Sequence, residues 1–417
     1  MFLPASLLAV AVGEAVLFDG GFSPASRIVF AALSALALVA AAARGPRRAR
    51  ELVRQPVVVV LLALGGLGLA SAAWTVGFPG AAARWGLVVA GYAAVLVASA
   101  ALVRERARGV DAVAVLVCAL ATASGVVGLV ATARHAGPFA DRVAGAWRPG
   151  GTLEYSPALA LLEVSALPAL LTAMCRGSGA TRGLAAFGGA VAAAVLALSG
   201  SRTGLALAAL VCAAVVAAPG RTVRSARATV LPALAVLASV GVIAHLAGAA
   251  GTGPDAPARV AGPLASQAAP RADAGPDGGF WHGRLHTWRA ALETAADRPL
   301  AGAGADAFLV ASARHQRAGP VRFAHDLPLE LAAELGVAGL VLGLALFLTA
   351  GAAVWRARAG RAAWLLGPAV VAFLASGLVD WPWHLAGSGA VWAASLGALV
   401  GRRPRPRLAC PGLERTS

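Results

Sequence analysis

The stretch LGVAGLVLGLALFLTAGAAV, residues 335–354, contains 20 consecutive residues without a charge. An α-helix rises 1.5 Å per residue, so a helix of this length spans about 30 Å, the thickness of the hydrocarbon core of a bilayer. Backbone polar groups inside lipid must be satisfied within the segment itself, which a helix achieves and a single strand does not. The stretch therefore predicts a membrane-spanning helix.

Similar apolar runs recur along the whole chain of 417 residues, 59% of which are hydrophobic and only 13% charged. Soluble domains carry about 25% charged residues, so lipid is expected to cover much of this surface. The sequence predicts an all-α polytopic membrane protein with about 12 transmembrane helices and a large external loop. The predicted spans are 2–18, 27–43, 56–74, 85–103, 111–133, 157–175, 184–199, 203–219, 229–247, 335–354, 363–380 and 387–400.

The formal charge of +16 does not indicate nucleic-acid binding, because the basic residues are all Arg and lie in short clusters between apolar runs. Such clusters mark the cytoplasmic side of membrane proteins. Their alternation predicts a multi-pass membrane protein with both termini in the cytoplasm. The first run, 2–18, lacks a basic start and is interpreted as a span rather than a signal peptide. The four cysteines show no CxxC or Cys/His spacing, so neither a disulfide framework nor a metal site is predicted.

These spans divide the chain into four parts. Residues 1–247 hold spans one to nine, 248–334 form a large external loop, 335–400 hold spans ten to twelve, and 401–417 form a cytoplasmic tail. Within the large loop, the Gly/Ala/Pro tract 248–279 is predicted to be disordered, whereas 280–334 is predicted to be helical and catalytic. A shorter external loop covers 134–156.

Three external segments hold residues that could carry chemistry. In the first, Ser199-Gly200-Ser201-Arg202-Thr203-Gly204 separates the seventh and eighth spans. Arg202 could anchor a helix end at the membrane interface, or it could bind an anionic headgroup. The residues alone favour the anchor.

The second segment runs from Gly283 to Arg289 and continues into Asp297-Arg298-Pro299, which ends the expected helix. Arg284 and Trp288 are four residues apart and share one helix face. The segment is also compatible with an ordinary interfacial amphipathic helix. The GAGAD sequence that follows is too short and too common to indicate a nucleotide site, and no P-loop or dinucleotide fingerprint occurs in the chain.

The third segment is Ala324-His325-Asp326-Leu327-Pro328-Leu329-Glu330, followed by Glu334. Asp326 can cap a helix that starts there and runs into the tenth span, and Pro328 suits its first turn. His325 then precedes a helix N-terminus, which disfavours a positive charge and keeps the imidazole neutral, as a base requires. A surface His without a role is the equally weighted alternative.

Taken together, the SRTG element, the GRLHTW and DRPLAGAGADAF stretches, and AHDLPLELAAELGVAGL resemble the O-antigen ligase family. That family also includes O-antigen and exopolysaccharide polymerases and some protein O-oligosaccharyltransferases. Weaker likeness extends to Ser71-Ala72-Ala73-Trp74 and to Arg142-Val143-Ala144-Gly145. The Asn-containing stretch often found after the second of these elements is replaced here by Gly151-Thr152-Leu153-Glu154-Tyr155-Ser156-Pro157.

The resemblance implies transfer of a glycan from undecaprenyl pyrophosphate to a glycan or lipid acceptor at the outer face of the plasma membrane. It implies that Arg202 and Arg284 bind the pyrophosphate and that His325 activates the acceptor, without a metal ion or other cofactor. Possible supporting residues are Arg142, Trp288, Arg289, Asp326 and Glu334. Partners other than the donor and acceptor are membrane lipids, and nucleic acid is not expected. Ligase and polymerase share these motifs, so the acceptor stays open.

A multi-span secondary transporter is the main alternative, because twelve spans are common among carriers. Charged residues near the bilayer midplane would favour it, and Glu14 and Glu163 are the best candidates, although either could lie at an interface or pair within the bundle. A non-catalytic partner of a flippase is a third and less supported interpretation. The gathering of polar motifs outside the spans favours an enzyme.

Overall fold

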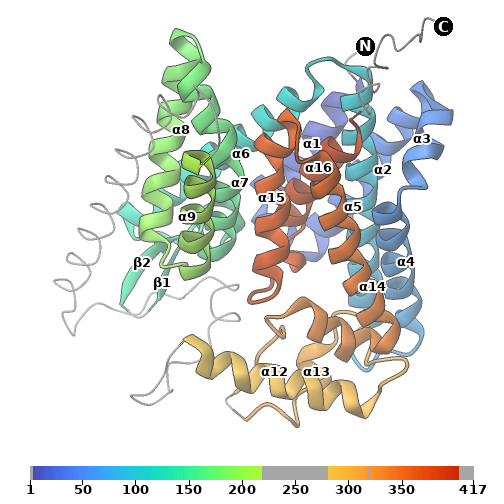
Figure 1. Ribbon diagram of the computed structural model, residues 1–417. Helices are drawn as coiled ribbons and strands as arrows, with labels where there is room; N and C mark the ends of the chain where they lie inside the picture. The colour runs from blue at the N-terminus through green and yellow to red at the C-terminus, as the bar shows by residue number, and fades with distance from the viewer. Residues whose placement is uncertain (1–2, 144, 218–279, 318, 403–417) are drawn as a thin grey trace, which may run out of the picture.

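The computed structural model of the protein describes residues 3–143, 145–217, 280–317 and 319–402, and this part of the chain is mainly helical (Figure 1). The helices that coincide with predicted spans are α1 (Leu3–Leu17), α2 (Pro24–Arg44), α4 (Pro56–Ala70), α5 (Pro79–Glu105), α6 (Gly109–Arg134), α7 (Ser156–Arg176), α8 (Gly179–Leu198), α9 (Arg202–Ala217), α14 (Leu327–Ala357), α15 (Arg361–Gly377) and α16 (Ala386–Val400). The others are α3 (Pro46–Val53), α12 (Phe280–Asp297) and α13 (Phe308–Ala311).

Seven helices in the described ranges are long and apolar enough to cross a membrane by length and composition, namely α2, α4, α5, α6, α7, α8 and α14. Helices α1, α9, α15 and α16 are also apolar but shorter. The predicted class, a helical membrane protein, is confirmed. The total of twelve crossings stays a prediction, because the predicted span 229–247 lies outside the described residues, as do the tract 248–279 and most of the tail.

Proline fixes the first turn of several helices, including α2, α3, α4 and α5. Proline lacks an N–H group, which the first turn of a helix leaves unpaired in any case. At α2 the preceding Ser23 adds a cap, since its hydroxyl accepts a hydrogen bond from the backbone N–H of Ser26 at 3.3 Å. These local signals explain why the helices begin at the ends of the apolar runs.

Helix α5 lies at the centre of one block of helices and packs against α2, α4 and α16. Small residues allow these helices to approach closely: an added Cβ on Gly86 would lie 2.6 Å from the carbonyl oxygen of Gly65 on α4. Close packing of Gly and Ala faces is the usual way for helices to associate in lipid, where burial of apolar surface gives no driving force between them. Helix α16 is buried along almost its full length.

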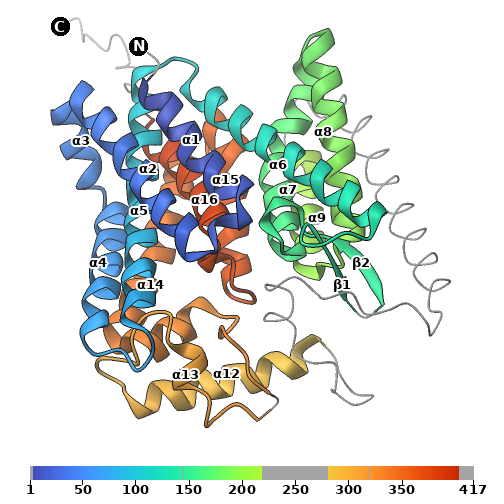
Figure 2. The ribbon, with the colours of Figure 1, turned by 180° about the vertical axis from the view of Figure 1, so that it is seen from behind.

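The described helices form two groups (Figures 1 and 2). Helices α6 to α9 form one group and the remaining long helices the other, and α15 packs on α7 between them. Helices α12 and α13 lie across one end of the second group, at the end where the β-hairpin of the first group also lies. The Arg-rich helix α3 lies at the opposite end.

The predicted loop 134–156 is not irregular, and its structure is an exception to the all-α prediction. Strands β1 (Ala140–Val143) and β2 (Ala146–Pro149) pair in antiparallel register, with Arg142 opposite Trp147. Gly145 has a φ of +84° in the turn between them, a conformation that glycine adopts without steric cost. A 3-10 turn, η3 (Gly151–Leu153), then leads into α7.

Helix α14 is interrupted at Gly336, whose φ of +65° and ψ of −157° are not helical. The chain after α12 forms main-chain hydrogen bonds to the residues next to the break. Ala303 N–H donates to the carbonyl of Ala333 at 3.0 Å, and Gly304 N–H donates to the carbonyl of Glu334 at 2.7 Å. In the opposite direction, Val337 N–H donates to the carbonyl of Pro299 at 2.8 Å. The interruption falls at the predicted boundary between the external loop and the tenth span.

Candidate active site

The GAGAD turn, residues 302–306, packs tightly against neighbouring segments. Gly302 and Gly304 have φ values of +68° and +98°, and a side chain on either would collide with its neighbours. Ser71 Oγ accepts the N–H of Ala305 at 3.0 Å, and Trp74 Nε1 donates to the carbonyl of Ala301 at 3.0 Å. The Ser71–Trp74 element noted in the sequence therefore supports the loop that precedes His325.

The predicted helix start at Asp326 is confirmed. Asp326 caps α14, since its Oδ1 accepts the N–H of Leu329 at 2.9 Å, and Pro328 lies in the first turn. His325 precedes the cap with a φ of +56°, in the left-handed region that a non-glycine residue seldom adopts. Its side chain is buried rather than exposed at the surface. A buried residue in an unfavourable backbone conformation is a common mark of a functional site.

The imidazole of His325 lies beside the carboxylate of Asp380, with Nδ1 3.3 Å from Oδ1. The contact is electrostatic, because its angle falls outside hydrogen-bond geometry. The hydroxyl of Tyr155 and the backbone N–H of Trp381 each donate to the same Oδ1 at 2.9 Å, which fixes the carboxylate. A carboxylate next to Nδ1 favours a proton on that nitrogen and leaves Nε2 as the acceptor. The arrangement gives His325 the partner that a general base needs.

Arg284 on α12 belongs to the same cluster. Burial lowers the pKa of its guanidinium, and the negative charge of Asp380 opposes part of that lowering, so the guanidinium lies within electrostatic range of Asp380. Arg284 and His325, which the sequence placed in separate segments, thus share one neighbouring carboxylate. Asp380 is their common neighbour.

Arg202 is exposed at the first turn of α9. The turn before it packs on β2, where the guanidinium of Arg148 lies 2.8 Å from the position of a Cβ on Gly200. Gly204 lies against Ala160, one turn after Tyr155 along the chain. The SRTG element is therefore next to the start of α7, close to the helix end that carries Tyr155. The anchor and the headgroup interpretations of Arg202 both remain predictions.

The five supporting residues have different surroundings. Arg142 Nε donates to the carbonyl of Gly145 at 3.4 Å within the hairpin turn. Trp288 is half-buried on α12, and Arg289 is exposed there. Asp326 is the helix cap described above. Glu334 is buried, and its two oxygens accept the N–H groups of Asp306 and Phe308 at 2.9 Å each, so it shapes the loop.

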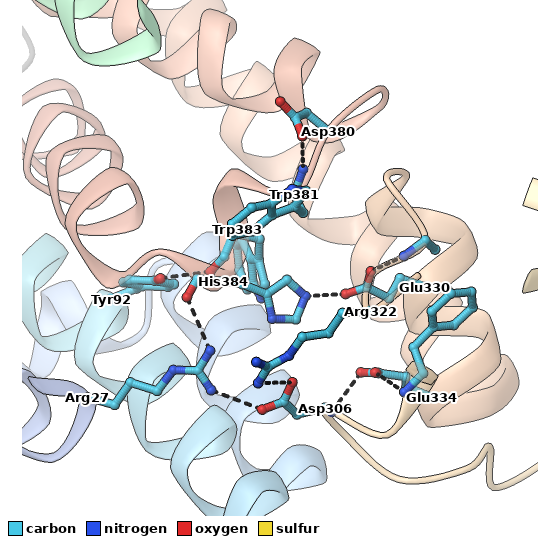
Figure 3. Close-up of polar contacts among 12 residues, drawn as sticks. Arg27, Tyr92, Asp306, Arg322, Glu330, Glu334, Asp380, Trp381, Trp383 and His384 are labelled. Atoms are coloured by element: carbon cyan, nitrogen blue, oxygen red, sulfur yellow. Dashed lines mark hydrogen bonds and ion pairs between the residues drawn. The ribbon is translucent and has the colours of Figure 1, made fainter. Parts of the chain in front are cut away.

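Sequence analysis missed a buried polar network that includes Arg27, Asp306, Glu330 and His384 (Figure 3). Arg27 on α2 forms an ion pair with Asp306 at 3.0 Å, both side chains being 5% exposed. His384, in the connection between α15 and α16, contacts Glu330 on α14. The only sequence signal was the polar and aromatic composition of Asp380-Trp381-Pro382-Trp383-His384 at the end of a predicted span.

The two acidic residues considered for a transporter could have lain at an interface or paired within the bundle, and neither is fully paired in the described part of the chain. Glu163 on α7 is fully buried, and neither of its carboxylate oxygens has a hydrogen-bond partner in the described part of the chain. Its nearest neighbours include the backbone of Gly125 on α6. Glu14 on α1 likewise has one oxygen, Oε2, that is buried without such a partner there.

Asp141 on β1 offers a test of the hairpin's packing. It is 3% exposed, and burial, followed by the charge of Glu154, raises the pKa of its carboxyl to about 7. Since the ordinary value is about 4, the folded state should lose stability as the pH rises from about 4 to about 7. Asp141→Asn should therefore raise the thermal midpoint in detergent at pH 8 and leave it nearly unchanged at pH 4. An equal shift at both pH values would contradict this account.

The fold and the site define a multi-pass helical membrane protein whose site-forming polar residues gather at one end of its helices. Comparison with protein families makes the assignment more specific. The family described as O-antigen ligase matches residues 187–344, which begin within α8 and end within α14. The match supports an O-antigen ligase-like family for this chain and confirms the resemblance found in the sequence. Members of that family are membrane glycosyltransferase-type enzymes acting on lipid-linked glycans.

The matched residues include Arg202, Arg284 and His325. The likenesses at Ser71–Trp74 and Arg142–Gly145 lie outside them, as do Tyr155 and Asp380. No curated protein matches the chain. The contact between His325 and Asp380 is therefore a finding of this structure and not of the family match.

Proposed function

We propose that the protein transfers a glycan from undecaprenyl pyrophosphate to an acceptor hydroxyl or amide at the outer face of the plasma membrane, by ligation or polymerisation. The observation that carries the proposal is the cluster of His325, Asp380 and Arg284. It combines a candidate base with a cation near the same point. Such a pair suits a reaction in which a nucleophile loses a proton while an anionic group leaves.

In the proposed reaction, Nε2 of His325 accepts the proton of the acceptor as the acceptor attacks the anomeric carbon of the glycan. The bond between that carbon and the pyrophosphate oxygen breaks, and undecaprenyl pyrophosphate leaves with the electron pair. Arg284, together with Arg202, stabilises the negative charge that develops on the leaving group. Asp380 stabilises the imidazolium that forms on His325.

The proposed reaction assigns the neutralisation of the pyrophosphate to arginine side chains, whose planar guanidinium groups bind phosphate oxygens in pairs. One observation supports the side of the membrane on which it takes place. The Arg-rich helix α3 lies at the end of the helices opposite α12. By the excess of Arg in cytoplasmic connections, α3 faces the cytoplasm and the site faces outward.

Reconstitution tests the function directly. Proteoliposomes holding the protein would receive radiolabelled glycan on undecaprenyl pyrophosphate and a cell-envelope extract from a strain lacking this protein as the acceptor source. We expect label to move from the mild-acid-labile pyrophosphate linkage to an acid-stable product, whose identity distinguishes ligase from polymerase. Movement of intact donor across the bilayer without new linkage would instead support the transporter.

A further inference from the structure

The connection between α15 and α16, residues 378–385, contacts the segment around His325 at two places. At its start, Asp380 lies beside the imidazole of His325. Four residues later, Nε2 of His384 contacts Oε1 of Glu330, in a pair whose side chains are 1% and 4% exposed. The first contact is thus made by His325 itself and the second by Glu330, five residues after it.

Glu330 extends the second contact to the backbone next to His325. Its other oxygen, Oε2, accepts the N–H of Ala324 at 2.7 Å. The ring of Phe323 adds a second link, since it stacks on His384 with centroids 4.0 Å apart and on Trp381 with centroids 4.8 Å apart. The two residues before His325 are thus held by the connection that also carries Asp380.

The connection is itself fixed by helices outside this segment (Figure 3). Nη2 of Arg27 on α2 donates to the carbonyl of His384 at 3.3 Å, and the hydroxyl of Tyr92 on α5 donates to the carbonyl of Trp383 at 2.9 Å. Arg27 is held in turn by its ion pair with Asp306. These bonds fix the position of His384, which can therefore restrict the movement of its neighbours Glu330 and Phe323.

His325 needs such support because its backbone is in the left-handed region, with a φ of +56°. An L-residue leaves that region readily unless its surroundings hold it there. Rotation of this backbone would carry the imidazole away from Asp380. From these contacts we infer that His384 is a positioning residue, which acts through Glu330 and Phe323 to hold His325 beside Asp380. The inference rests on the proposed function, in which His325 is the base.

Two substitutions at His384 separate positioning from a direct chemical role. In His384→Gln the amide nitrogen can take the place of Nε2 and donate to Glu330, whereas His384→Ala removes the link. Since a misplacement of about 1 Å can cost about 10²-fold in rate, we expect a kcat loss of that order for Ala. Gln should recover most of the rate, and the KM for the lipid-pyrophosphate donor should stay unchanged in both. The assay is the proteoliposome transfer described above.

A double substitution tests whether His384 acts through His325 or only stabilises the fold. His384→Ala should cause no further loss in a His325→Ala background, because the residue acts through His325. A second single variant, Glu330→Ala, serves if His384→Ala does not fold. It removes both carboxylate oxygens, and with them the links to His384 and to the N–H of Ala324, so it should lower kcat in the same way. His315→Gln is the matched control, since His315 contacts Asp297 at 2.7 Å on the partly exposed side of α12.

Three results would overturn the inference: transfer by His384→Ala at the unmodified rate, a Gln variant as slow as Ala, or a further loss in the His325→Ala background. Failure of the proposed function is a different result. In that case the unmodified protein itself forms no acid-stable product from the lipid-pyrophosphate donor. If the unmodified protein transfers and His325→Ala does not, while His384→Ala is normal, only the inference on His384 fails.

Discussion

His325→Ala should nearly abolish glycan transfer, with a rate loss of about 10²- to 10⁴-fold, the range typical of general-base assistance. The expectation follows from the position of the imidazole beside the carboxylate of Asp380, which can stabilise the imidazolium that forms when the base accepts a proton. Initial rates with the labelled donor in proteoliposomes, at matched protein levels, provide the measurement. Binding of the donor should survive, because in the proposed reaction the arginines and not this His hold the pyrophosphate.

His286→Ala is the control for that experiment. His286 lies on α12, two residues after Arg284, and has no role in the proposed reaction. Its variant should transfer at a rate close to that of the unmodified protein. A His325→Ala variant that transferred as well as His286→Ala would refute the proposed mechanism even though the family match would stand.

Arg284→Ala should lower kcat/KM for the lipid-pyrophosphate donor by about 10- to 100-fold, since a hydrogen bond to a charged group contributes about 1.5–3 kcal/mol. Arg284→Lys should restore little. An ammonium is a point charge, whereas a planar guanidinium binds two phosphate oxygens at once. Arg202→Ala should act in the same direction. The measurement is the donor dependence of the initial rate.

Arg298→Ala controls for loss of positive charge near the site, because Arg298 is an exposed Arg just after the end of α12. Its kcat/KM for the donor should not change. If Arg284→Ala and Arg202→Ala also left kcat/KM unchanged, both residues would be interfacial anchors, and the pyrophosphate would be bound elsewhere.

The helices could be predicted from the sequence because lipid leaves few alternatives for an apolar run. Eleven of the predicted spans coincide with described helices. Proline at the first turn and Ser23 or Asp326 as caps give local reasons for where several of them begin. The hairpin was missed because its strands have four residues each, too few to show an alternating pattern. The break in α14 was also missed, since a glycine within an apolar run does not by itself indicate an interruption.

The site could be predicted only as far as it lies in contiguous motifs. His325 and Arg284 stand in recognisable segments, and the structure brings them to one cluster. Asp380 was assigned to the end of a predicted span, and its partner Tyr155 is 225 residues away along the chain. Arg27 and His384 meet across a still longer interval. Contacts of this kind depend on how helices pack, and a single sequence contains no local pattern that reveals them.

The interruption of α14 at Gly336 also limits how this chain can vary in length. The segment from Pro299 to Gly304 is joined to both sides of the break by main-chain hydrogen bonds, and each bond requires one particular residue spacing. The exposed side chains of Pro299, Leu300 and Ala301 could change without disturbing these bonds. One inserted or deleted residue would shift every donor past its acceptor, so this exposed half of the stretch tolerates substitution far better than a change in length.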